Sequence, residues 1–66
     1  MNYPKLRGRI KEMYGTETNF AKKIGKTKGW LSLILNKKRD FKKSDIDLFV
    51  KYLDIDTSEI NVYFFN

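Results

Sequence analysis

The sequence has no cysteine, no histidine and a single proline. Without cysteine no disulfide can cross-link the chain, and without cysteine or histidine the usual ligands of a structural zinc site are missing. A chain of 66 residues also buries too little surface to form two separate cores. We therefore expect one domain, residues 1–66, that is stabilised by helix packing or by association with another chain.

Long apolar runs are absent as well. No stretch approaches the roughly 20 apolar residues that cross a bilayer, and the N-terminal segment MNYPKLRGRI lacks the continuous apolar region of a signal peptide. These absences predict a soluble, cytoplasmic protein with no membrane partner.

Groups that carry out catalysis are scarce. The chain has no histidine or cysteine, no phosphate-binding glycine loop and no pair of acids in an evident pocket. Two pairs of nearby acids are interpreted as helix-end and loop residues and not as catalytic pairs. They are Asp45 with Asp47 and Asp54 with Asp56. We expect no enzymatic activity, no cofactor, no metal ion and no small-molecule ligand.

Charge is plentiful but unevenly placed. Residues 1–43 hold 13 Lys or Arg against 3 acids, a net of +10, whereas residues 44–66 hold one Lys against 5 acids, a net of −4. Lysines can simply keep a small domain soluble. The asymmetry nevertheless favours a protein with one face for a polyanion and a far side kept away from it.

Apolar residues recur at helical spacing along the whole chain. The first expected helix begins near Pro4 and stops at Gly15, the second follows Thr16 as its N-cap and ends at Gly25, and the third follows Thr27 and runs to Asn36. The expected buried residues are Leu6, Ile10, Met13 and Tyr14 in the first helix, Phe20, Ala21 and Ile24 in the second, and Leu31, Ile34 and Leu35 in the third.

The charged segment KKRDFKK then predicts a loop in which only Phe41 is buried. A fourth helix is expected to start with a capping box of Ser44 and Asp47. Its apolar stripe is Ile46, Phe49, Val50 and Leu53. A last short turn begins near Thr57 and runs into the tail VYFFN, where Val62 to Phe65 also suit an extended strand by propensity. The predicted fold is all-α, a compact bundle of short helices.

The second and third helices have the spacing of a helix-turn-helix. With Glu17 as position 1, apolar anchors fall at positions 4, 8, 15 and 18, a small residue at 5 and glycine at 9. These residues are Phe20, Ile24, Leu31, Ile34, Ala21 and Gly25. A tight turn between two crossing helices needs a small facing residue and a left-handed backbone position, which this pattern supplies.

The third helix, about residues 27–36, would then read the major groove of double-stranded DNA. If Leu31, Ile34 and Leu35 turn inward, about 100° per residue leaves other residues on the outer side. The expected base-reading residues are Thr27, Lys28, Gly29, Ser32 and Leu33. The expected contacts to the DNA backbone are Thr16 and Glu17 before the second helix and Asn36, Lys37, Lys38 and Arg39 after the third.

Three side chains allow more than one interpretation. Trp30 either covers the junction of the second and third helices or contacts the sugar-phosphate edge of DNA. Packing is favoured, because burial of a large aromatic side chain stabilises a small domain. Glu17 is unfavourable against phosphate, so it orients Lys28 or stabilises its own helix end. Leu33 is a thymine-methyl contact or a chance surface residue.

The segment TETNFAKKIGKTKGWLSLILN, continued by LNKKRDF and the ending SEINVYFF, resembles the helix-turn-helix domains of the lambdoid phage Cro and repressor family. It is most similar to small Cro-like regulators of Gram-positive prophages. The resemblance implies five helices in a lambda-repressor-like fold, operator binding as a homodimer and transcription regulation in a bacterial host, close to the nucleoid. It implies the same base-reading and backbone residues.

The chain departs from this family at several positions. Glu17 stands where the family usually has Gln, Lys26 replaces an apolar turn residue, and Lys37 stands where Gly often follows the third helix. Gly29 and Leu33 replace polar base readers. The operator sequence is therefore expected to be particular to this protein.

The apolar C-terminal part can serve in either of two ways. Its apolar residues either form a homodimer interface or complete the core of one chain. They are Ile55, Ile60, Val62, Phe64 and Phe65. A second class of function also fits the sequence, an antitoxin-like or anti-repressor module that uses the same fold against an acidic protein surface. Steep salt dependence of binding to random DNA would separate the two.

Overall fold

A computed structural model describes residues 2–65; Met1 and Asn66, the two ends of the predicted domain, lie outside the described residues. Residues 2–65 contain helices and no strand, in the order α1 (Pro4–Tyr14), α2 (Glu17–Lys23), α3 (Lys28–Leu35), α4 (Lys43–Leu53), the 3₁₀ turn η1 (Thr57–Glu59) and α5 (Ile60–Phe64). The predicted all-α bundle of five short helices is confirmed.

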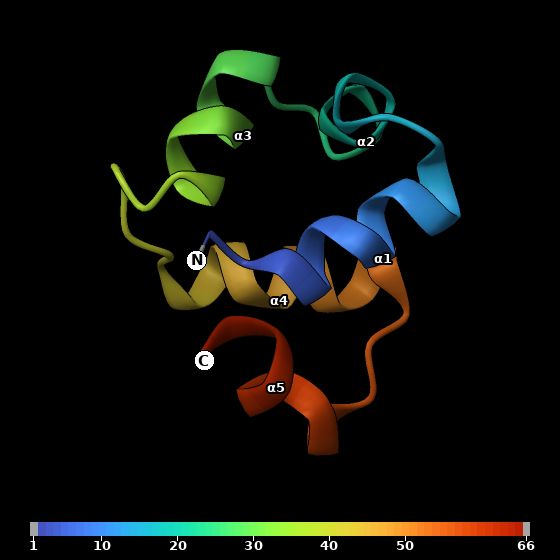
Figure 1. The fold of residues 1–66 in the computed structure, drawn as a ribbon, viewed down its shortest axis with the longest axis vertical. Coiled ribbons are helices and arrows are strands. Elements are labelled where there is room, and N and C mark those ends of the chain that lie inside the picture. The colour runs from blue at the N-terminus through green and yellow to red at the C-terminus, as the bar shows by residue number, and fades with distance from the viewer. Residues whose placement is uncertain (1, 66) are drawn as a thin grey trace.

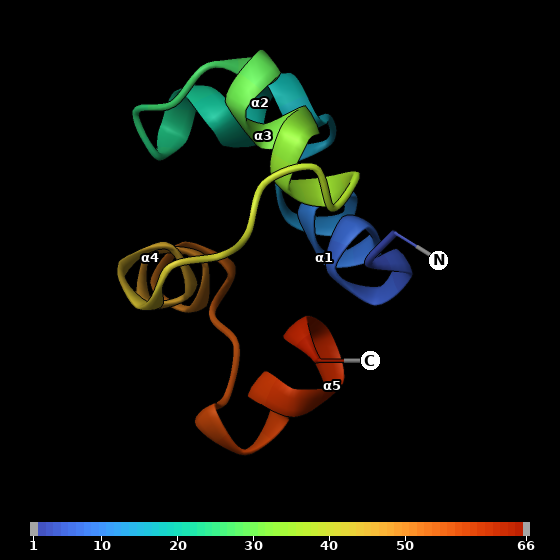
Figure 2. The same ribbon diagram turned by 90° about the vertical axis from the view of Figure 1, so that its left-hand side faces the viewer.

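The helices form a compact body of 27 × 24 × 22 Å. In Figure 1, α2 and α3 lie at one end of the long axis, α1 and α4 cross the middle, and α5 lies at the opposite end. A quarter turn in Figure 2 shows α1 and α4 on opposite flanks, with α2 and α3 above them and α5 below. The α2–α3 pair is therefore a projecting end of the molecule.

The boundaries of α2 and α3 follow from local chemistry. The hydroxyl of Thr16 accepts from the Asn19 N–H and that of Thr27 from the Trp30 N–H, each at 3.0 Å, so both helices have the predicted N-cap. Gly15 ends α1 at φ 82°, and Gly25, in the turn between α2 and α3, has φ 75°. Both glycines adopt a backbone conformation that other residues reach only with strain.

The start of α4 differs from the prediction. The expected capping box of Ser44 and Asp47 is wrong, because the helix already begins at Lys43. The carboxylate of Asp45 accepts from the backbone N–H of Lys42 at 3.0 Å and is itself buried. Asp45 stands three residues after the N-cap Lys42, where an acid can reach back to the free N–H. Asp47 instead pairs with Lys43 at 3.6 Å on the exposed side.

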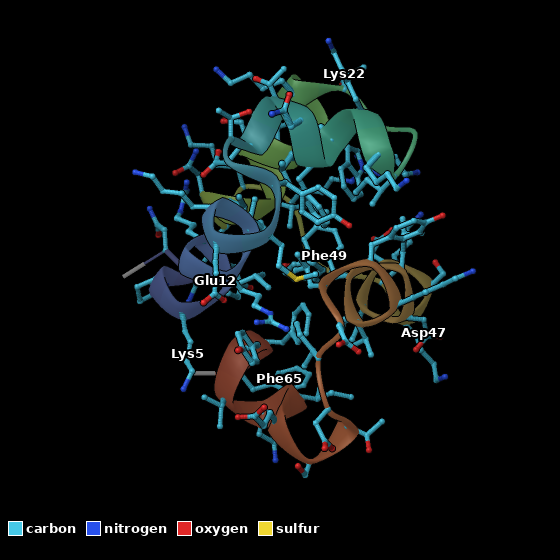
Figure 3. The ribbon with its side chains drawn as sticks, turned by 90° about the vertical axis from the view of Figure 1, so that its right-hand side faces the viewer. Lys5, Glu12, Lys22, Asp47, Phe49 and Phe65 are labelled. Atoms are coloured by element: carbon cyan, nitrogen blue, oxygen red, sulfur yellow. The ribbon has the colours of Figure 1, made fainter. Side chains whose placement is uncertain are left out.

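The core joins apolar residues from every α-helix. The aromatic rings of Phe20, Phe41 and Phe64 surround Phe49 of α4, with ring centroids 5.0, 5.1 and 6.2 Å from it. Figure 3 shows Phe49 in the middle of the molecule. The fully or nearly buried apolar residues are Leu6, Ile10, Phe20, Ala21, Ile24, Leu31, Ile34, Leu35, Phe49, Leu53, Ile55 and Phe64. Phe49 thus packs α4 against α2 through Phe20 and against α3 through Trp30.

The predicted stripe of α1 is buried over its first two turns only. Leu6 and Ile10 are fully covered, but Met13 is 42% exposed, so its predicted burial is wrong. In this last turn Tyr14 makes the contact instead, because its hydroxyl donates to the Tyr52 carbonyl at 2.6 Å. The last turn of α1 is thus attached to α4 through Tyr14.

The helix α5 includes Val62 to Phe64, so the extended alternative is wrong for these residues, and Phe65 follows as the C-cap. Ile60 and Phe64, four residues apart, both pack onto the core, whereas Val62 is 39% and Phe65 is 65% exposed. A strand would place Ile60, Val62 and Phe64 on one side. Burial of Ile60 and Phe64 without Val62 requires the helical period.

Candidate nucleic-acid interface

The two sides of α3 differ sharply in burial. Leu31, Ile34 and Leu35 are fully buried against the core. On the other side Lys28 and Gly29 are exposed, Ser32 is half-buried, and Leu33 is 45% exposed. Thr27, just before the helix, is exposed as well. The structure therefore brings the five expected base-reading residues to one outward surface, which we call the α3 outer face.

Two residues of this face are open to a partner. Within residues 2–65 the Lys28 ammonium makes no ion pair and no hydrogen bond. A Cβ added at Gly29 would meet only the Thr27 hydroxyl, at 3.9 Å, which is an ordinary contact. Since glycine disfavours a helix by about 1 kcal/mol relative to alanine, the fold gives no reason for Gly29. A flat, uncharged position next to Lys28 suits close approach of another molecule.

Ser32 and Asn36 are joined to each other. The Asn36 side-chain amide donates to the Ser32 carbonyl at 2.9 Å and to the Ser32 hydroxyl at 3.2 Å. The Asn36 side-chain oxygen accepts from Arg7 at 3.1 Å and from Asn2 at 3.4 Å. The amide of Asn36 is thus engaged within the protein at both ends.

The partner of Glu17 corrects one prediction. Glu17 does not orient Lys28; its carboxylate accepts from the Arg7 guanidinium at 2.8 Å. Both side chains are 31% exposed, so the pair is partly screened by solvent and contributes modestly to stability. Arg7 also donates through Nε to the Asn2 carbonyl at 2.8 Å. A single guanidinium therefore connects the starts of α1 and α2 with the end of α3.

Arg7 is the residue that sequence reasoning missed. It lies ten residues from Glu17 and 29 from Asn36 in the chain, so no local pattern pairs them. The only available signal was a lone acid, Glu17, at the start of a helix in a strongly basic segment. Arg7 and Glu17 also line a pocket of about 430 Å³ between α1 and the start of α2, together with Gly8, Lys11, Gly15 and Thr16.

The other expected backbone contacts border the α3 outer face. Lys37, Lys38 and Arg39 are exposed directly after α3. Lys37 has φ 58°, a left-handed conformation that favours glycine, and its ammonium lies 5.0 Å from the Tyr3 ring centroid. Thr16 is exposed, but its hydroxyl is used as the cap of α2.

Trp30 takes the packing role. The indole is half-buried, 6.1 Å from the ring centroid of Phe49 in α4. The Lys26 ammonium, from the turn between α2 and α3, lies 5.0 Å from the indole centroid. Lys26 stands at a turn position for which an apolar residue was expected. Its ammonium is stabilised there by a cation–π contact, because an aromatic face attracts a cation.

The charge asymmetry of the sequence becomes an asymmetry in space. The end of the molecule formed by α2, α3 and the following loop carries exposed Lys22, Lys23, Lys28, Lys38 and Arg39. In Figure 3, Lys22 projects from this end, while Asp47 points outward from α4. The segment at the opposite end holds Asp54, Asp56 and Glu59. Hydrogen bonds from the Ser58 backbone and side chain lower the pKa of Asp56 below 3.8.

The C-terminal apolar residues divide into two groups. Ile55 and Phe64 are buried and Ile60 packs on the core, so these three complete the core of one chain. Phe64 lies 5.1 Å from Phe41 between ring centroids. Phe65 is the most exposed large apolar residue of the described chain. Of the expected set, Val62 and Phe65 alone present substantial surface outward.

Comparison with known proteins adds a family but no activity. No helix in the described part of the chain is long and apolar enough to cross a membrane, and residues 2–65 hold no cluster of three potential metal ligands. A search of curated proteins finds no match. A family match covers residues 1–66 and carries the description "Protein of unknown function (DUF739)". Since this match spans the full length, the chain belongs to the DUF739 family.

Proposed function

We propose that this protein is a sequence-specific double-stranded DNA-binding regulator of transcription, of the phage Cro and repressor type, and that α3 reads the major groove of its operator. The observation that carries the proposal is the α3 outer face. It projects from one end of the molecule, contains an unpaired Lys28 beside an open Gly29, and is bordered by exposed cations. Residues 44–66, which include η1 and α5, have a net charge of −4, as suits a protein that approaches a polyanion from one side.

The residues of the α3 outer face match the chemistry of base edges. Lys28 can donate to guanine O6 or N7, and Ser32 can bond to base edges. Leu33 can contact a thymine methyl group. Gly29 lets the backbone approach closely, since its Cβ position is open. Each residue type has a counterpart in the major groove, and no buried side chain has to move.

Phosphates would be contacted from the border of this face. Lys37, Lys38 and Arg39 carry charge at the end of α3, where they can neutralise one strand. Asn36 and Glu17 are weaker candidates, because a side-chain oxygen of each already accepts from Arg7 and the Asn36 amide donates to Ser32. One such module covers few base pairs, so we propose that two copies bind a palindromic operator, with half-sites about one helical turn apart.

Selection of bound duplexes from a random oligonucleotide pool tests the proposal directly. The expected result is an enriched palindrome, which would report both base preference and two-fold symmetry. Enrichment of no sequence, together with no measurable binding to duplex DNA at about 50 mM salt, would contradict DNA recognition. That outcome would favour the protein-interaction module with an acidic partner.

Two lysine variants test the division into base readers and phosphate anchors. Lys28→Ala should weaken binding to the selected operator by about 5- to 100-fold, with less effect on random DNA. Lys38→Ala should weaken both by similar factors. Lys51→Ala, on α4 and away from the α3 outer face, is the matched control and should change neither. Equal effects of Lys28→Ala and Lys38→Ala on both DNAs, measured by fluorescence anisotropy, would refute the assignment.

A further inference from the structure

The contacts of Arg7, Asn36 and Ser32 form a chain of hydrogen bonds with a fixed direction. Arg7 donates to the Asn36 side-chain oxygen at 3.1 Å, and the Asn36 amide donates to the Ser32 hydroxyl at 3.2 Å. A guanidinium has donors only, so the oxygen of Asn36 must face Arg7. The Ser32 carbonyl, 2.9 Å from the amide, can only accept, so the nitrogen must face Ser32.

This direction continues to the Ser32 hydroxyl. Because the oxygen of Ser32 accepts from Asn36, its proton must point to another acceptor. A serine in a helix often donates to the carbonyl four residues earlier, here that of Lys28. The structure contains no such bond, and within residues 2–65 the Ser32 hydroxyl donates to no protein atom. The side chain is half-buried, so its proton remains accessible from outside.

We infer that Arg7, acting through Asn36, makes Ser32 a hydrogen-bond donor toward DNA, so that Ser32 reads an acceptor atom on the base edge. Serine alone can donate or accept and therefore discriminates poorly. The Asn36 amide occupies one of the two lone pairs of the Ser32 hydroxyl, and the proton has no acceptor within residues 2–65. The hydroxyl therefore favours guanine O6, thymine O4 or a purine N7 over the amino groups of adenine and cytosine. Arg7 is a positioning residue here, and the inference rests on the proposed function.

The test uses operator DNA obtained by selection and base analogues at each position. One set of analogues removes a single acceptor (N7, O6 or O4), and the other removes a single donor (adenine N6 or cytosine N4). At one base pair, acceptor removal should weaken wild-type binding by about 3- to 10-fold and leave Ser32→Ala binding unchanged. Donor removal at that base pair should have no effect.

An isosteric change reverses the direction. In Asn36→Asp the carboxylate still accepts from Arg7 but has no N–H, so it accepts the Ser32 proton and leaves the lone pairs of the hydroxyl facing outward. Its added negative charge should weaken binding to every DNA alike. The sensitivity to acceptor removal at the Ser32 base pair should disappear, whereas that at other positions should persist. Arg7→Met should reduce this sensitivity at the same base pair alone.

The outcomes separate this inference from the proposed function. A wild-type loss on donor removal at the Ser32 base pair, or full acceptor sensitivity in Asn36→Asp, would overturn the Arg7–Asn36–Ser32 assignment while DNA recognition stands. Absence of sequence-selective binding would overturn both. Because Arg7 also pairs with Glu17, the melting temperature of Arg7→Met should be checked, and Asn36→Asp, on an exposed residue, provides the test if Arg7→Met fails to fold.

Discussion

Two glycines, Gly8 inside α1 and Gly15 at its end, differ in backbone conformation and not in packing. Backbone conformation therefore determines what each glycine contributes to stability. Gly8 lies inside the helix, is exposed, and a Cβ added there would have no atom within 4 Å. Gly15 ends the helix at φ 82°. The first glycine costs helix stability without a packing reason, whereas the second supplies a conformation that an L-residue reaches only with strain.

Alanine at these two glycines should therefore have opposite effects. We expect Gly8→Ala to raise the free energy of unfolding by about 0.5–1 kcal/mol, because alanine has the higher helix propensity. Gly15→Ala should lower it by about 1 kcal/mol or more, because φ 82° is strained for alanine. Urea unfolding at an unchanged m-value measures both. A gain in stability from both changes would contradict the assigned backbone conformation of Gly15.

At the scale of elements, α2, α3, α4 and η1 each begin with a side chain that accepts from an unpaired backbone N–H group. Thr16 and Thr27 cap α2 and α3 through their hydroxyls, and Asp45 reaches back from inside α4. The turn before α5 is capped by the carboxylate of Asp56, which accepts from the Ser58 N–H at 3.0 Å. Among these caps, Asp56 is the one whose pKa is lowered by the bonds that it accepts.

The cap at Asp56 should make the last turns sensitive to acid. The Ser58 backbone and side chain lower its pKa below 3.8, so its stabilising effect is present above about pH 4 and is lost as pH falls through the lowered pKa. Asp56→Ala should lower the melting temperature at neutral pH, and its gap to the wild type should narrow as the pH falls through the lowered pKa. Asp56→Asn keeps an acceptor and is the control.

In Asp56→Asn the cap does not depend on pH. The melting temperature of this variant should therefore rise relative to that of the wild type as the solution becomes acidic. Circular dichroism melts at a series of pH values measure all three proteins. A gap between the wild type and Asp56→Ala that does not narrow at any acidic pH would show that the carboxylate of Asp56 does not act as the cap.

For the whole molecule, the separation of charge matters more than the net charge of +6. Exposed Lys22, Lys23, Lys28 and Lys38 belong to α2, α3 and the loop after α3, whereas exposed Asp56 and Glu59 belong to η1 and its N-cap. An electrostatic surface of this kind attracts a polyanion in one orientation. The position of a charge should therefore decide its effect on DNA binding.

Two charge reversals of equal size test this expectation. Lys38→Glu and Lys51→Glu change the net charge identically, but Lys38 follows α3 and Lys51 lies on α4. Lys38→Glu should weaken binding to random duplex DNA and reduce the slope of log K against log salt by about 1. Lys51→Glu should have a much smaller effect on both. Equal losses would show that net charge alone controls binding.

The sequence by itself determined the features that depend on neighbours a few residues apart. The caps at Thr16 and Thr27, the glycines at the turns and the buried side of α3 were all predicted and confirmed. A helix cap and a helical face involve residues within about four positions, so local chemistry suffices to place them. The surface on which the proposed function rests was therefore predictable.

Only the tertiary structure decided which distant groups meet. Glu17 lies in the first turn of its own helix, as one alternative predicted, but it pairs with Arg7 and not with Lys28. Arg7 also donates to Asn36, 29 residues away. The tail could be strand or helix by propensity, and the burial of Phe64 against Phe41 and Phe49 selects the helix. Such contacts depend on how the helices pack around one core, which local sequence patterns do not specify.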